Sequence, residues 1–256
     1  MDRLRTLARA LKNPSGPEAF AAGIRAFRAL FRARYPFHWA ELDWIQDSGF
    51  WRILERYGEQ DGLNAHRRKL LYEYARHATR HLRGDTAECG SFRGLGSHLI
   101  CRAITECGVS RRHYIFDSFE GLSHPNDTDG RYWSKGDLAC DEATVRRNLS
   151  DFDFVEYKKG WIPERFPEIA DRRFCFVHID VDLATPTGDS LAFFFPRLEP
   201  GGAIVLDDYG FASCPGATKV VDAFIAKEPL ASLVGSPVGG GVILNTAHIE
   251  LRHVQA

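Results

Sequence analysis

The sequence predicts a doubly wound α/β fold built on a mostly parallel β-sheet, from residue 85 onward. Short apolar runs of strand length alternate there with segments of helical periodicity, and acidic residues or glycines follow several of the runs. This alternation is typical of βαβ units, whose helices cover both faces of a parallel sheet. The earlier residues have helical periodicity, so we expect a helical N-terminal addition, 1–84, followed by the α/β domain, 85–256.

The individual elements follow from periodicity and from the Gly and Pro residues between them. Apolar, β-branched runs predict strands at 86–89, 114–117, 154–157, 174–180, 203–207 and 242–244. Helical spacing of apolar residues predicts helices at 61–81, 96–107, 142–149, 164–169, 187–197 and 215–226. In such a sheet, ligands bind beyond the carboxyl ends of the strands, which directs attention to the residues that close each strand.

Composition and charge exclude several classes of protein. The 33 lysines and arginines nearly balance the 34 aspartates and glutamates, and the net charge of -1 offers no basic surface for nucleic acid. No apolar stretch approaches the roughly 20 residues of a membrane span, and the Arg-rich start lacks the features of a signal peptide. None of the six cysteines has CxxC spacing, so we expect reduced thiols in a cytoplasmic protein without membrane partners.

The loop after the first strand is rich in glycine and follows an acid. Glycines allow a sharp turn and a close approach to a ligand, but neither the dinucleotide fingerprint nor the P-loop pattern fits the spacing. An acid before such a loop is typical of S-adenosylmethionine sites, although a plain tight turn explains the glycines equally well. The residues expected to contact this cofactor are Glu88, Gly90, Ser91, Gly94 and Ser97.

The next two strand ends complete a candidate nucleoside site. Asp117 can accept both hydroxyl groups of a ribose, with Ser118 beside it, whereas the structural alternative is a helix N-cap or an Asx turn. Gly160 and Trp161 follow the third strand, where the adenine would lie, although a Trp in this context is often a packing residue.

The fourth and fifth strands each end in a pair of aspartates. Asp180 and Asp182 are two residues apart, which in strand geometry points both side chains to one side, and Asp207 with Asp208 ends the next strand. Four carboxylates at this range repel one another, so either protons or a cation must be present. Oxygen ligands favour Mg2+, and we expect the nearby His178 to belong to the strand interior.

Several motifs together resemble the TylF-type (macrocin) O-methyltransferases. The segments that carry the resemblance are 116–122, 135–137, 177–183, 195–198, 200–202, 207–210 and 214–217. Two positions depart from the family pattern: Leu95 stands in place of a glycine, and Ala184 in place of a frequent aromatic residue. The resemblance implies a Rossmann-like class I methyltransferase fold that methylates hydroxyl groups of sugars and other natural products, with Mg2+ assistance.

The resemblance also implies roles for the aspartates. Asp180, Asp207 and Asp208 would hold the metal, Asp180 would also lie against the cofactor, and Asp182 or Asp180 would remove the proton from the acceptor. The family's N-terminal region helps to enclose the substrate, so residues 1–84 are expected to form a lid or an oligomer interface. The residues expected to line the acceptor pocket are Tyr35, Phe37, His38, Trp39, Trp133 and Tyr209.

Two other functions stay open from the sequence. A catechol- or caffeoyl-type metal-dependent O-methyltransferase would share the sheet, the cofactor and the metal. A non-catalytic scaffold that binds S-adenosylmethionine would share the fold, although intact acids at all four strand ends argue against it. Both O-methyltransferase functions imply a small-molecule acceptor, and both are compatible with a homo-oligomer.

Overall fold

The computed structural model describes residue 44 and residues 47–247 of the 256. The chain divides into two compact units, Met1–His66 and Arg67–Ala256. Within the first unit, α3 (Ser48–Tyr57) begins at Asp47, whose side chain accepts a hydrogen bond from the Phe50 amide, and ends at Gly58 in the left-handed region. The division at residue 66 differs from the boundary at 84, which was placed by pattern alone; the lid role of the N-terminal region stays a prediction.

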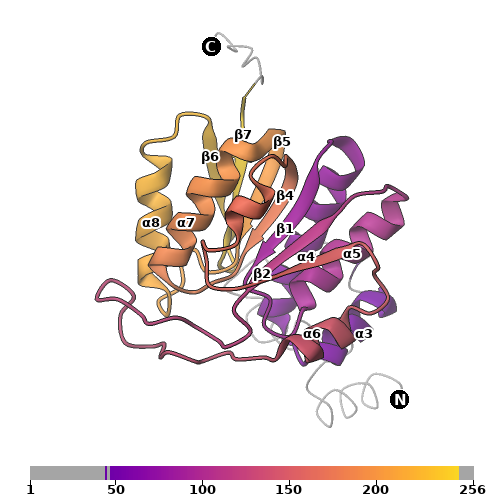
Figure 1. Cartoon of the computed structure of the whole chain (residues 1–256), viewed down its shortest axis with the longest axis horizontal. Helices are drawn as coiled ribbons and strands as arrows, with labels where there is room; N and C mark the ends of the chain where they lie inside the picture. Colours follow the sequence, from indigo (N-terminus) through magenta and orange to yellow (C-terminus); the bar gives the residue numbers. More distant parts are fainter. Residues whose placement is uncertain (1–43, 45–46, 248–256) are drawn as a thin grey trace, which may run out of the picture. The chain divides into compact units, whose positions relative to one another are not determined.

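The second unit contains a seven-stranded sheet with the strand order β3-β2-β1-β4-β5-β7-β6 (Figure 1). Five strands, β1 to β5, are parallel, and β7 runs antiparallel to both β5 and β6. The strands are β1 Asp85–Cys89, β2 His113–Asp117, β3 Val155–Lys159, β4 Phe174–Ile179, β5 Leu198–Leu206, β6 Ala231–Gly235 and β7 Gly241–Asn245. The predicted doubly wound, mostly parallel sheet is therefore confirmed.

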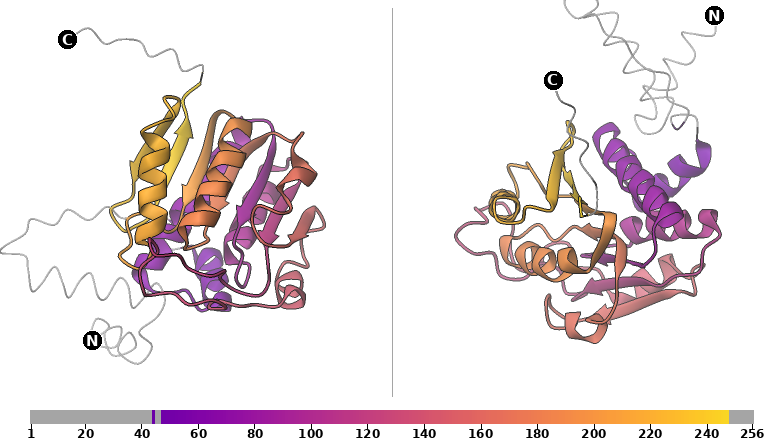
Figure 2. Two further views of the ribbon diagram at one scale, coloured as in Figure 1. Left: turned by 60° about the vertical axis from the view of Figure 1, so that its left-hand side comes forward. Right: turned by 90° about the horizontal axis from the view of Figure 1, so that it is seen from above.

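Helices cover both faces of this sheet (Figure 2). One face packs against α7 and α8 around a large aromatic and aliphatic core that includes Phe116, Val177 and Phe194. The opposite face lies under α5 and α6, where Ile115 and Val145 belong to a smaller cluster. The helices are α4 Gly62–His81, α5 Leu95–Cys107, α6 Glu142–Asn148, α7 Ala184–Phe194 and α8 Pro215–Ile225.

Several predicted boundaries were wrong for local reasons. The strand predicted at 174–180 ends at Ile179, and the one predicted at 203–207 extends back to Leu198 as β5. The helix predicted at 164–169 is a short 3-10 turn, η2 (Phe166–Ile169), whose second residue is proline. The helix predicted at 187–197 begins earlier, at Ala184, and changes to a 3-10 turn, η3 (Phe195–Arg197), at Pro196.

The edge strand β6 was not predicted at all. Its residues are exposed or half-buried, as expected for an edge strand, and it therefore lacks a continuous apolar run. None of the six cysteines, all within the described residues, forms a disulfide, in agreement with the expectation of reduced thiols. Among the helices of the described residues, none is both long and apolar enough to cross a membrane.

Candidate functional site

The carboxyl ends of β1, β2, β4 and β5 meet at one edge of the sheet and are tied together by the main chain. Backbone hydrogen bonds run from Gly90 to Phe116, from Asp180 to Cys89 and from Asp207 to Ile179. Gly90 has a positive φ, and a Cβ at this position would overlap the carbonyl oxygen of Asp180. The glycine therefore lets the cofactor loop and the aspartate-bearing loop pack against each other.

The acids at this edge form two groups. Asp207 and Asp208 follow the end of β5 at Leu206, and their side chains belong to different groups. Asp207 lies with His178 and Asp180, and Asp208 lies with Asp182 and Cys214; within each group the candidate ligand atoms are all within 4.8 Å of one another. All four predicted aspartates thus gather at one sheet edge, but the predicted metal set is divided between the two groups.

The placement of Asp182 differs from the strand geometry used to predict it. β4 ends before Asp180, and the chain then makes a tight turn in which the Leu183 amide bonds to the Val181 carbonyl at 2.6 Å. Asp182 occupies the left-handed region with φ 58°, which is unusual for a residue with a side chain. This turn moves its carboxylate from the side of Asp180 to the side of Asp208.

Arginines neutralise the first group. The guanidinium groups of Arg67 and Arg68, both on α4, form ion pairs with Asp207. Arg68 Nη1 is 2.8 Å from Asp207 Oδ1 and 3.7 Å from Asp180 Oδ2. The structure therefore places a positive charge between these two carboxylates.

The charge of Arg67 also acts on the second group, but burial and the neighbouring acids outweigh it, so the pKa values of this group are strongly shifted. Burial, followed by the negative charges of Asp208 and Asp180, raises the pKa of Asp182 to about 9. Burial and Asp180 raise the pKa of Asp208 to about 7, against the opposing effect of two backbone hydrogen bonds. Burial and Asp208 likewise raise the pKa of the Cys214 thiol to about 12. This pattern is expected where acids have been assembled for a cation.

Asp117 is held ready to accept further hydrogen bonds. Its Oδ2 accepts from the backbone N–H and the hydroxyl of Ser91, at 2.6 and 2.8 Å, and its Oδ1 accepts from the amide of Phe119 at 2.7 Å. Each carboxylate oxygen has two lone pairs, so Oδ1 retains one for a further donor, whereas Oδ2 could accept from a diol only in place of the Ser91 hydroxyl. The N-terminus of α5 follows this loop at Gly94, where no side chain caps the helix.

Glu88 and Ser97 are placed below the loop. Glu88 is 1% exposed, and its carboxylate accepts hydrogen bonds from Ser97 and from His178 Nδ1, the latter at 2.8 Å. In the structure, Glu88 bonds to two side chains of the protein itself. Its expected contact with the cationic groups of the cofactor stays a prediction.

The remaining predicted cofactor residues surround the ends of β2 and β3. The Gly160 amide bonds to the Asp117 carbonyl at 3.0 Å, which sets the two strand ends side by side. Trp161 is half-buried, and its amide donates to Glu164 at 3.2 Å. Ser118 stabilises its own turn, since its hydroxyl donates to the Gly121 carbonyl and accepts from the Glu120 amide.

Trp133 reaches the aspartates from the long loop that follows β2. Its indole N–H donates to Cys214 Sγ at 3.4 Å, and this sulfur lies 3.6 Å from an oxygen of Asp182. The loop is fixed by Asp129, a buried acid that accepts from the Ala184 amide at the start of α7, at 2.7 Å. Asp129 could not be recognised from the sequence, because the helix whose first amide it accepts from lies 55 residues further along the chain.

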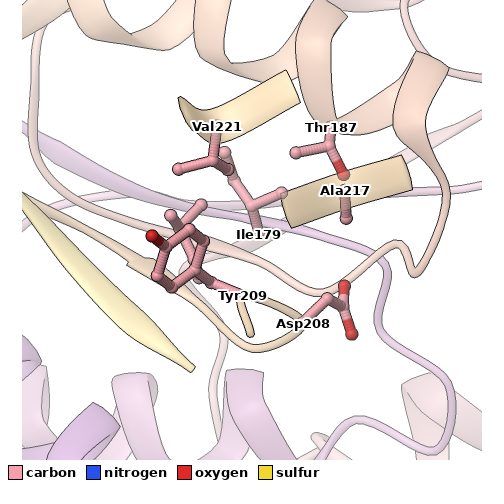
Figure 3. A pocket seen from close by; sticks show the side chains of 7 residues that line it. Ile179, Thr187, Asp208, Tyr209, Ala217 and Val221 are labelled. Carbon is pink, nitrogen blue, oxygen red and sulfur yellow. The ribbon is translucent and has the colours of Figure 1, made fainter. Parts of the chain in front are cut away.

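Tyr209 lines a small pocket of mostly apolar side chains between β4, β5, α7 and α8 (Figure 3). Its hydroxyl donates to Asp222 on α8 at 2.9 Å. In this pocket the carboxylate of Asp208 points away from the apolar side chains. The other residues expected in the acceptor pocket, Tyr35, Phe37, His38 and Trp39, lie outside the described residues.

Three functional candidates were missed from the sequence, and each belongs to the acidic edge. Arg67, Arg68 and Cys214 contact the aspartates, and all three come from segments distant in sequence from β4. A pair of arginines on a helix is usually a solvated face, and a single cysteine usually a core residue, so neither pattern is informative alone.

The fold resembles solved methyltransferase structures. The O-methyltransferase NovP superposes with a TM-score of 0.62 at 26% identity, over 70% of this chain and 79% of that one. The calicheamicin methyltransferase CalS11 gives a TM-score of 0.61 at 19% identity, over 84% and 89% of the two chains, and supports the fold alone. Fold and strand-end acids together define a class I methyltransferase that uses S-adenosylmethionine to methylate oxygen.

Sequence comparison gives the family. Residues 65–235 match the model of the macrocin O-methyltransferase (TylF) family, and the chain belongs to that family. A tetracenomycin-C rhamnosyl 4'-O-methyltransferase of Streptomyces olivaceus is 34% identical over 67% of this chain and 69% of that protein. The mycinamicin III 3''-O-methyltransferase of Micromonospora griseorubida is 32% identical over 51% of this chain and 57% of its own.

Proposed function

We propose that this O-methyltransferase acts on a sugar hydroxyl of a small natural product and that a divalent cation assists the transfer. The oxygen ligands favour Mg2+ as this cation. The observation that carries the proposal is the convergence of four carboxylates at the ends of β4 and β5. The raised pKa values of Asp182 and Asp208 support a cation, because burial and the neighbouring acids outweigh the charge of Arg67 at both carboxylates. Two relatives, one named for a rhamnosyl tetracenomycin and the other for mycinamicin III, support the acceptor class.

The cation ligands in this proposal are Asp180, Asp207 and Asp208. Their donor set of carboxylate oxygens fits a hard divalent ion, and Arg68 shows that a positive charge fits between Asp180 and Asp207. When bound, the ion would lower the pKa of the acceptor hydroxyl, and S-adenosylmethionine would supply the methyl group.

Asp182 is the carboxylate proposed to take the proton from the acceptor. It is 6% exposed, belongs to the group with Asp208 and Cys214, and is held by its unusual backbone turn. An oxygen–methyl bond forms as the sulfur–methyl bond breaks, and the hydroxyl proton passes to the Asp182 oxygen. Asp180, on the neighbouring group, is the alternative base from the sequence, but its contact with Arg68 favours a ligand role.

The cofactor is proposed to lie across the ends of β1, β2 and β3. Asp117 would accept the ribose hydroxyls, and the loop with Gly90, Ser91 and Gly94 would enclose the methionine part. Ser118, Gly160 and Trp161 would border the adenine. Trp133 and Tyr209 are proposed for the acceptor side, where Trp133 reaches Cys214 beside Asp182.

Methyl transfer from isotope-labelled S-adenosylmethionine tests this function. Glycosylated macrolides and anthracycline-type rhamnosides would be compared with catechol and caffeoyl acceptors, each with and without Mg2+. We expect labelled product from glycosylated acceptors only when the cation is present. Product from catechols alone would instead establish the diphenol-type activity that shares this site.

A further inference from the structure

A chain of buried polar side chains runs beneath α5 to the acidic edge of the sheet. It consists of side chains from β1, β2, α5 and β4, each no more than 1% exposed. Its members in order are Thr86, His113, Ser97, Glu88 and His178. Buried polar groups are kept only where hydrogen bonds compensate the cost of removing them from water, so their donors and acceptors must match.

The first half of the chain has a definite direction. Burial lowers the pKa of His113 to about 3, so its ring carries one proton. Thr86 Oγ1 is 2.8 Å from His113 Nδ1, and His113 Nε2 is 2.8 Å from Ser97 Oγ. The Ser97 hydroxyl donates its single proton to Glu88, so Ser97 must accept from His113 Nε2–H. His113 Nδ1 then accepts from Thr86.

The same matching fixes the proton on His178. A carboxylate only accepts hydrogen bonds, so His178 Nδ1, at 2.8 Å from Glu88 Oε1, carries the ring proton. In the neutral imidazole, His178 Nε2 then presents a lone pair. This atom is fully enclosed and has no hydrogen-bond partner among the described residues.

The lone pair of His178 is directed at acids. Nε2 lies 3.9 Å from Asp207 Oδ1, and it shares a group with Asp180 in which all candidate ligand atoms are within 4.8 Å. Neither carboxylate can donate to it. Arg68 neutralises the two acids yet leaves this nitrogen unsatisfied, whereas a metal ion could bind all three side chains.

The pairing of Glu88 with His178 also depends on a glycine. Gly96 lies in the first turn of α5, and a Cβ there would overlap Glu88 Oε1 and lie 2.9 Å from His178 Nδ1. Any larger residue would displace the hydrogen bond that orients the imidazole. The ring orientation is therefore supported from two sides, by the carboxylate and by the close approach of the helix.

We propose that His178 Nε2 is a metal ligand together with Asp180 and Asp207, and that this nitrogen makes the site prefer Mn2+, Fe2+ or Co2+ over Mg2+. Glu88 is a positioning residue, since metal-binding histidines usually donate their other N–H to a carboxylate or a carbonyl. Imidazole suits these ions better than it suits Mg2+, which favours oxygen ligands. The inference rests on the cation site of the proposed function: it keeps Asp180 and Asp207 as ligands, puts His178 in place of Asp208, which lies in the other group, and changes the metal preference.

Pulsed EPR of Mn2+ bound to the full, metal-depleted chain tests this directly. We expect a coupling from a coordinated nitrogen that changes when the protein is labelled with [15N]histidine. Calorimetry should show Co2+ bound more tightly than Mg2+, and His178→Asn should weaken Co2+ binding by about 10- to 100-fold. The asparagine amide can still donate to Glu88 but has no counterpart of Nε2.

His113→Asn is the matched control, because His113 belongs to the same buried chain but contacts Ser97 and not the acids. It should leave the nitrogen coupling and the Co2+ to Mg2+ ratio unchanged. Mn2+ bound without nitrogen coupling in the wild-type chain would overturn the His178 assignment and leave the Mg2+ proposal standing. Absence of any bound ion would overturn both, and the wild-type spectrum decides even if a variant fails to fold.

Discussion

The backbone N–H of Asp182 donates to Oδ2 of Asp208 at 2.7 Å, so the main chain itself fixes the acids that follow β4 and β5. The N–H of Val181 donates to the same oxygen at 3.1 Å. Two carboxylates are thereby held together, next to a thiol that cannot neutralise them. Without a cation, the folded chain favours their protonated forms.

This relationship predicts how stability depends on pH in the absence of metal. The pKa values of Asp182 and Asp208 rise from an ordinary 3.8 to about 9 and about 7 on folding, so the folded chain binds more protons than the unfolded chain. Stability should therefore fall as pH rises from about 4 through about 9. Melting temperatures of EDTA-treated protein across pH 5 to 9 measure the effect.

Asp208→Asn is the variant that should flatten this dependence, since it removes one acid and keeps the shape of the side chain. Added divalent cation should restore wild-type stability most strongly at high pH. A melting temperature that rises with pH in the metal-free wild type would contradict the raised pKa values of Asp182 and Asp208.

Asp117→Asn should weaken the binding of S-adenosylmethionine by about tenfold or more, because the carboxylate loses charge and one of its acceptor oxygens. Ser91→Ala is the matched control: it removes one hydroxyl donor to Asp117 but keeps the backbone donor. Calorimetric titration with S-adenosylhomocysteine measures both. Equal affinities for Asp117→Asn and the wild type would show that the ribose lies elsewhere.

Most of the fold could be predicted because its signals are local. Apolar runs such as 174–179 and the glycines between elements reflect burial and turn geometry within a few residues. The edge strand β6 could not be predicted, because its partner β7 supplies the hydrogen bonds and its side chains stay half exposed. The early start of β5, at Leu198, depends on pairing with Phe174 of β4.

The sequence could predict which aspartates belong to the site, but it could not predict how they are divided into two groups. Strand ends place Asp180 and Asp207 at one edge of the sheet, as the βαβ pattern implies. The positive φ of Asp182 is a property of one tight turn, and it decides on which side the carboxylate lies. The contacts of Arg68 and His178 with Asp207 depend on tertiary packing, which spacing along the chain does not encode.

Asp129→Ala should destabilise the protein by about 1–3 kcal/mol, because the buried Ala184 amide and the partly buried Asn126 amide lose their acceptor. The acid is 2% exposed and accepts from the amides of Ala184 and Asn126. Asp127→Ala, at an exposed position of the same loop, is the control and should change little. Chemical denaturation gives the free energy of unfolding of each, and equal values would show that the loop is not anchored by this cap.

Arg68→Met should raise the affinity for a divalent cation by about tenfold, because it removes a positive charge from between Asp180 and Asp207. Arg76→Met on the same helix, where the arginine pairs with Glu73, should leave the affinity unchanged. Titration with Co2+ followed by absorbance compares the two. Weaker binding after Arg68→Met would mean that the arginine supports the ion and does not compete with it.

The central claim, cation-assisted methyl transfer at these aspartates, is tested most directly by activity of the metal-depleted enzyme. Initial rates of methyl transfer to a glycosylated acceptor would be measured with EDTA, then after repletion with Mg2+, Mn2+ or Co2+, alongside Asp208→Ala. We predict that chelation and Asp208→Ala each abolish turnover, that cation restores only the wild type, and that binding of S-adenosylhomocysteine stays nearly unchanged. Full activity in EDTA, or in Asp208→Ala, would contradict the account.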